Sequence, residues 1–175
     1  SKRPLVLIGA SADRLLVSKA LKSFVEKTGI PFFSTQMGKG VIDEHHELCL
    51  GTAAVSANDY IHSAIAEADL IINVGHDVIE KPPFLMNKNK AEVIHINYYP
   101  ADVDQVYFPQ YEVVGDIAAA IRMISGYLEV NNDWDFSYYK QVKQVVDEKL
   151  QEKADDVSYP FKPQRIVNAV RKVLP

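Results

Sequence analysis

The sequence predicts an α/β fold, an open parallel sheet of about six strands with helices on both faces. Short, continuous apolar runs alternate with amphipathic helical patterns between residues 4 and 128. Such runs are typical of parallel strands that are buried on both faces, and consecutive parallel strands are usually joined by a crossover helix. Three of the runs end in glycine, which permits a tight turn into the next segment.

The first strand is predicted over residues 4–9, where "PLVLIG" is apolar up to its glycine. A helix is predicted over 13–28, because apolar side chains recur there at helical spacing and Gly29 provides a natural stop. Pro31 then opens a second short strand over 31–35, "PFFST". The stretch that follows, "QMGKGVIDEHHELCLG", contains three glycines and is expected to be irregular.

A second helix is predicted over residues 57–68, where one face carries the apolar side chains, and a buried strand over 70–75. Two further strands are predicted over 92–97 and 111–114. Asp116 is a suitable N-cap for a helix over 116–128.

The sequence changes character after the alternating part. We divide the chain into a domain at 1–130, a linker with an amphipathic helix at 131–158, and the start of a further domain at 159–175. The last segment predicts a helix with Pro163 in its first turn. Its apolar residues lead us to expect a further domain downstream that would cover them.

Composition excludes several classes of function. The formal net charge of −4 argues against nucleic-acid binding, which favours a basic surface. No apolar run approaches the length of about 20 residues that spans a membrane. The single cysteine, Cys49, cannot form an internal disulfide, and together these features predict a cytoplasmic protein.

Candidate binding residues lie where the predicted strands end. In open α/β sheets ligands bind outside the carboxyl ends of the strands, and the layout is Rossmann-like, of the FAD- or NAD-binding type. The fingerprint G-x-G-x-x-G is absent, since "GASADR" has one glycine, which disfavours a standard NAD site. The candidate residues are Gly9, Ala10, Gly75, His76, Asn97, Gly115 and Asp116.

Other constellations in the sequence support weaker readings. His45, His46 and Cys49 could bind zinc, but a structural zinc site needs four ligands and the chain offers no second pair. Cys49 in "LCLG" is in an apolar setting that suggests an inert core thiol. The charged groups in "GHDVIEK" (75–81) could do acid–base chemistry or could be a solvated loop.

Four segments resemble the central domain of thiamine-diphosphate-dependent enzymes, with the acetolactate synthase large (catalytic) subunit as the nearest likeness. The resemblance covers residues 3–128 in order, and the tail is similar to the entry of that family's C-terminal, pyrophosphate-binding domain. The matching segments are 35–51, 68–80, 91–104 and 112–121.

This resemblance implies an enzyme that condenses two pyruvates to acetolactate with release of CO2. It also implies thiamine diphosphate and Mg²⁺ held by N- and C-terminal domains outside this chain, in a homodimer or homotetramer. The resemblance then places no catalytic residue and no metal ligand in this chain, so we expect the isolated domain to be inactive. Another carboligase or decarboxylase, of the glyoxylate carboligase or pyruvate oxidase type, and a stand-alone nucleotide-binding module remain open alternatives.

The loop 75–81 is similar to that of the catabolic acetolactate synthases, which do without FAD. FAD-binding relatives carry arginines where Asp77 and Lys81 stand here, and Asp77 would repel a phosphate. We therefore expect no FAD and a vestigial nucleotide cleft that is filled or gated by His76. Met37 and Gly38 still match the FAD-binding pattern, which adds Met37 to the candidate residues and leaves weak flavin binding open.

Overall fold

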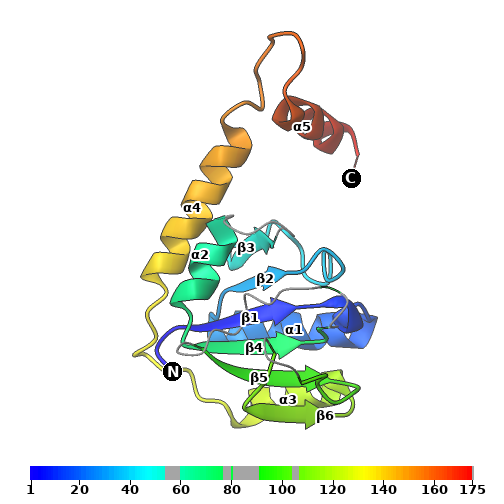
Figure 1. The fold of residues 1–175 in the computed structure, drawn as a ribbon, viewed down its shortest axis with the longest axis vertical. Coiled ribbons are helices and arrows are strands. Elements are labelled where there is room, and N and C mark those ends of the chain that lie inside the picture. The colour runs from blue at the N-terminus through cyan, green and yellow to red at the C-terminus, as the bar shows by residue number, and fades with distance from the viewer. Residues whose placement is uncertain (54–59, 77–79, 81–90, 104–106, 175) are drawn as a thin grey trace.

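The computed structural model describes residues 1–53, 60–76, 80, 91–103 and 107–174 of the chain. Within these residues six strands form one all-parallel sheet in the order β3-β2-β1-β4-β5-β6 (Figure 1). The predicted fold class is confirmed. The strands are β1 (Pro4–Ile8), β2 (Phe32–Ser34), β3 (Cys49–Thr52), β4 (Leu70–Val74), β5 (Glu92–Asn97) and β6 (Tyr111–Val114).

Helices cover both faces of the sheet. In Figure 1, α1 and α3 lie on one face, and α2 with the first part of α4 lies on the other. None of the described helices is long and apolar enough to cross a bilayer. The helices are α1 (Leu15–Thr28), α2 (Tyr60–Glu67), α3 (Ile117–Tyr127), α4 (Ser137–Gln151) and α5 (Pro163–Val173), and a 3₁₀ turn follows β1 at Ala10–Ala12.

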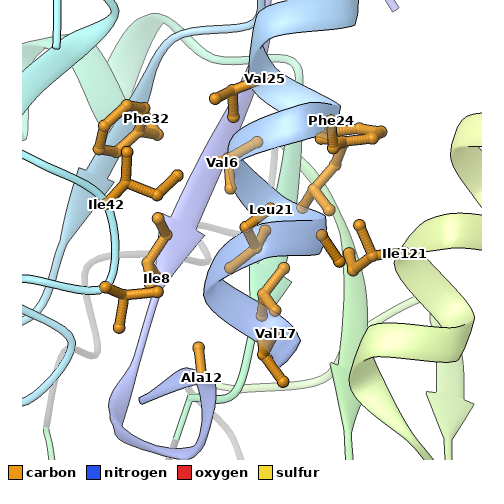
Figure 2. Packing of buried hydrophobic residues seen from close by; sticks show 14 of the residues in the cluster. Val6, Ile8, Ala12, Val17, Leu21, Phe24, Val25, Phe32, Ile42 and Ile121 are labelled. Atoms are coloured by element: carbon orange, nitrogen blue, oxygen red, sulfur yellow. The ribbon is translucent and has the colours of Figure 1, made fainter. Parts of the chain in front are cut away.

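Alternate side chains of β1 enter two separate cores, as the period of a strand requires. Val6 and Ile8 pack beneath α1, where Figure 2 shows them facing Leu21 and its neighbours. Leu5 and Leu7 point to the other face, where they join α2 and α4. Both sets are essentially inaccessible to solvent, so β1 is the centre of the molecule.

Strand β3 corrects the expectation of an irregular segment before residue 51. Cys49 and Leu50 are buried, and Phe32 of β2 is paired with Cys49. The strand is a short edge strand with a register shift against β2. Two buried residues beside a polar loop give too short an apolar run for the sequence pattern to reveal it.

Helix α4 packs against the sheet layer rather than standing apart from it. Tyr139 is 1% exposed, and its hydroxyl donates a hydrogen bond to the carbonyl of Arg3 at 2.9 Å. Val142 is buried in the same cluster, which also contains Leu5 and Ile61. The segment after residue 130 therefore completes one of the two cores, and the divisions at residues 130 and 158 stay predictions.

Helix α5 has no buried residue. It lies beyond the end of α4 in Figure 1. Pro163 occupies the first turn, as predicted. Polar contacts hold the helix, among them an ion pair of 2.8 Å between Arg171 and Glu44. Its exposed apolar residues are Ile166, Val167, Val170 and Val173.

Replacing Tyr139 by alanine should lower the free energy of unfolding by about 3–5 kcal/mol, because a buried aromatic side chain is lost and the α2/α4 core is left with a cavity. Tyr127→Ala is the matched control, since this tyrosine is 87% exposed and should change stability by less than about 0.5 kcal/mol. Urea denaturation measures both. Equal effects would show that α4 does not belong to the cooperative unit.

Backbone amides of α5 should exchange with solvent faster than those of β4. Helix α5 buries nothing, whereas β4 is hydrogen-bonded to strands on both sides at the centre of the sheet. Amide hydrogen exchange followed by mass spectrometry or NMR compares the two segments directly. Slower exchange in α5 than in β4 would contradict the prediction.

Candidate functional site

The strand order reverses its direction of growth between β1 and β4. From β1 the chain adds β2 and β3 on one side, and β4, β5 and β6 on the other. In doubly wound sheets a reversal of this kind opens a crevice at the carboxyl ends of the strands, where ligands bind. The segments that follow β1 and β4 are therefore the place to look for a site.

Backbone hydrogen bonds hold these strand ends together. The amide of Gly9 donates to Val74 at 2.8 Å, and the amide of Gly75 donates to Ile96 at 2.9 Å. The side-chain amide of Asn97 donates to the carbonyl of His76 at 2.8 Å. The structure thus brings Gly9, Gly75, His76 and Asn97 to one edge of the sheet, as the sequence predicts.

Glycine is required at the two positions where β1 and β4 end. A Cβ on Gly9 would lie 2.6 Å from Cα of His76 and 2.8 Å from the carbonyl oxygen of Gly75. Gly75 has φ +69°, and a Cβ there would lie 2.4 Å from the amide nitrogen of Ala12. The two turns are in direct backbone contact, which leaves no room for a side chain between them.

The carboxylate of Glu80 fills the space beside the first turn. Its Oε2 accepts a hydrogen bond from the amide of Ala10 at 3.0 Å, and its Oε1 accepts one from the hydroxyl of Thr35. Nδ1 of His76 lies 3.8 Å from Oε2. The exposed fractions of the Glu80 and His76 side chains are only 3% and 6%. The carboxyl group of Glu80 therefore occupies the edge between β1, β2 and β4.

Thr35 extends this arrangement to the loop after β2. Its hydroxyl accepts a hydrogen bond from the amide of Gly38 at 3.0 Å while it donates to Glu80. The side chain of the neighbouring Met37 is 65% exposed and lies outside the buried group. The buried group of His76, Glu80 and Thr35, with the amide of Ala10, is called the Glu80 cluster below.

Gly115 and Asp116 lie farther along the edge, after β6. The amide of Gly115 donates to the carbonyl of Asn97 at 2.8 Å. Asp116 caps α3, because its Oδ1 accepts from the amide of Ala119 at 2.7 Å, and the predicted N-cap is confirmed. Asp77 and Lys81, on which the loop comparison depends, lie outside the described residues. A cofactor-binding role for all these positions stays a prediction.

A second polar group lies within the sheet face that α2 and α4 cover. The Asn73 amide donates to the Tyr107 hydroxyl at 2.6 Å, and Nδ1 of His95 lies 2.9 Å from the same hydroxyl. Nε2 of His95 lies 3.1 Å from the carbonyl of Tyr99, which can only accept, so Nε2 is the donor in this contact. Burial raises the pKa of the Tyr107 phenol.

Comparison with known proteins identifies the family to which this chain belongs. Residues 1–124 match the family model described as "Thiamine pyrophosphate enzyme, central domain". The chain belongs to this family. Similar curated proteins include the acetolactate synthase large subunit of Porphyra purpurea, 31% identical over 133 residues, and the acetolactate synthase of Bacillus subtilis (strain 168), 30% identical over 126 residues.

The chain corresponds to only a part of each of these proteins. The two alignments cover 75% and 71% of the chain, but each covers only 22% of the relative. Glyoxylate carboligase of Escherichia coli O157:H7 is 22% identical over 184 residues, which cover 98% of the chain and 30% of that protein. The chain thus spans between about a fifth and a third of the length of these relatives.

The described part of the central domain contains no cluster of three or more His, Cys, Asp or Glu side chains that could hold a metal ion. The residues weighed for zinc are separately engaged: His45 contacts Asp43, and His46 accepts a hydrogen bond from the amide of Leu48. Cys49 is buried, and burial raises the pKa of its thiol. This agrees with the expected inert core cysteine.

Sequence reasoning missed three of the polar residues that the structure brings together. Thr35 is the last residue of the second predicted strand, and ligands bind at the ends of such strands. Its position in the sequence could therefore have identified it. Asn73 and His95 are paired across β4 and β5, and each interrupts an apolar run. Glu80 was visible as a charge in the loop, but its burial depends on contacts with Thr35 and Ala10. These residues are 45 and 70 positions away from it in the sequence.

Gly9→Ala should lower the free energy of unfolding by about 1–3 kcal/mol, because the added methyl group would lie 2.6 Å from Cα of His76 and 2.8 Å from the carbonyl oxygen of Gly75. Gly126→Ala is the control. It lies in α3 with nothing within 4 Å of the added Cβ, and it should raise stability by about 0.5–1 kcal/mol. Thermal and urea unfolding measure both variants. A neutral Gly9→Ala would disprove the close contact of the two turns.

Proposed function

We propose that this chain is the central domain of an acetolactate synthase large (catalytic) subunit, nearer the catabolic, FAD-independent type. The carrying observation is the family match over residues 1–124 together with relatives named acetolactate synthase at about 30% identity across three quarters of the chain. In the parent enzyme two pyruvates are condensed to acetolactate and CO2 is released.

In this proposal thiamine diphosphate and Mg²⁺ are bound by the N- and C-terminal domains of the parent enzyme, which is a cytoplasmic homodimer or homotetramer. Thiamine diphosphate supplies the electron sink for decarboxylation. The contribution of the central domain is structural. Its sheet fixes the distance and orientation of the segments that enter and leave it, and the isolated domain does not catalyse the reaction.

The edge of the sheet supports the FAD-independent form of the proposal. A flavin nucleotide would bring phosphates to the carboxyl ends of β1 and β4, and the described residues there fit this group poorly. The amide of Ala10 already donates to a carboxylate, and the Glu80 side chain is almost fully buried against Gly9. His76 and Asn97 are used in contacts within the domain.

Glyoxylate carboligase activity is the second candidate. It is favoured by one observation, an alignment with a glyoxylate carboligase that covers 98% of the chain. The lower identity of 22% places it behind the acetolactate synthase reading. Both candidates belong to the same family and differ in the substrate that is decarboxylated.

The full-length protein that contains this chain should form acetolactate from pyruvate when thiamine diphosphate and Mg²⁺ are present. Activity should be lost when either is withdrawn and should not depend on added FAD. A colorimetric acetoin assay after acid decarboxylation of acetolactate measures the product. The isolated 175-residue chain serves as the negative control.

Three results would contradict the proposal. Conversion of glyoxylate with no conversion of pyruvate would favour the second candidate. A strict requirement for FAD would overturn the FAD-independent assignment while leaving the enzyme class intact. Turnover that needs no thiamine diphosphate would overturn the enzyme class itself.

A further inference from the structure

We propose that Glu80 is a specificity-determining residue that keeps nucleotide phosphates out of the crevice between β1 and β4. The inference rests on the proposed function only where that proposal takes the domain to be FAD-independent. It adds the residue responsible and the physical cause. An internal carboxylate occupies the position that an anionic ligand would need, and it accepts from the same hydrogen-bond donor.

The location follows from the topology. The order β3-β2-β1-β4-β5-β6 places its reversal between β1 and β4, where doubly wound domains bind the phosphates of dinucleotides. The backbone directly after the first strand is the part that approaches the phosphates, and glycine at that point permits the approach. In this chain that backbone is Gly9 and Ala10, and the group in contact with it is the Glu80 carboxylate.

Space and charge both act against a phosphate. Oε2 of Glu80 lies 3.0 Å from the amide nitrogen of Ala10, so this donor is already used. A Cβ on Gly9 would lie only 2.7 Å from the same oxygen, which shows that the carboxylate lies directly against the turn. A second anion brought next to a carboxylate that is shielded from water would be strongly repelled.

The carboxylate lies beside groups that follow three strands, and two of these groups donate hydrogen bonds to it. The amide of Ala10 follows β1, the hydroxyl of Thr35 follows β2, and Nδ1 of His76 follows β4 at 3.8 Å. A phosphate could displace Glu80 only by breaking these contacts and by moving the charge elsewhere. Buried polar groups that lose their partners are costly, so displacement is unfavourable.

The test compares binding of ADP and of inorganic pyrophosphate to the 175-residue chain and its variants by isothermal titration calorimetry. Glu80→Ser removes the charge and opens the space while leaving the Ala10 amide free to donate. It should bind ADP about ten- to a hundredfold more tightly than the unsubstituted chain, the range expected for one recovered charge-assisted hydrogen bond. The affinity for pyrophosphate should also increase, because the recovered hydrogen bond is made to a phosphate group.

Glu80→Gln is the conservative variant, which keeps the length of the side chain and an oxygen that can accept from Ala10. It should bind ADP more tightly than the unsubstituted chain but less tightly than Glu80→Ser, because it removes the repulsion and keeps the obstruction. Glu129→Gln is the matched control for the change in net charge. Glu129 is exposed and follows the end of α3, which begins after β6 at the carboxyl edge and runs back toward the amino edge, so its replacement should leave ADP binding unchanged.

The outcomes separate the inference from the proposed function. Circular dichroism identifies the folded variants, and if Glu80→Ser does not fold, Glu80→Gln decides. Folded variants whose ADP affinity stays within about twofold of the unsubstituted chain would overturn the role of Glu80 and leave FAD independence standing. Micromolar binding of ADP or FAD by the unsubstituted chain would overturn both.

Discussion

The backbone contact between the ends of β1 and β4 is the constraint on which the rest of the ligand edge depends. Gly9 and Gly75 lie so close that neither position has room for a Cβ, and the amide of Gly9 donates to Val74 across the gap. This contact places Gly75 and His76 directly beside the turn that follows β1. The Glu80 carboxylate can then reach the amide of Ala10, and the side chain of Asn97 can bond to the backbone of His76.

The two cores fix the position of the strands that form this edge. Every residue of β1 is buried, and its side chains alternate between the α1/α3 core and the α2/α4 core. Helix α4 arrives from far along the chain, and its Tyr139 bonds to the carbonyl of Arg3 at the opposite, amino end of the sheet. A central domain built in this way can transmit position between the segments that enter and leave it without providing a reactive group, which is the structural role proposed for it.

The sequence predicted most of the fold but only part of the site. Strands such as 4–9 and 70–75 are visible because burial on both faces gives a continuous apolar run, and the glycines that end them mark the edge. Strand β3 was not visible, because its buried part is only Cys49 and Leu50. The role of Glu80 was hidden for a different reason: its partners Ala10 and Thr35 are distant in sequence, and local patterns carry no information about such contacts.

Under the proposed FAD-independent function, the Glu80 cluster gives a physical reason why a nucleotide-type fold can be kept without a nucleotide. The strand order fixes where backbone donors are exposed, but not what accepts from them, since fold alone does not determine function. The partly buried amide of Ala10 gains from an acceptor whether or not a ligand is present. A carboxylate from the chain itself meets this need at no cost in association entropy. Because Thr35 also donates to this carboxylate, an incoming phosphate would have to compete with an acceptor that is already held in place. If the proposed FAD-independent function is correct, this internal contact takes the place of the one that the cofactor's phosphates would make with the sheet edge.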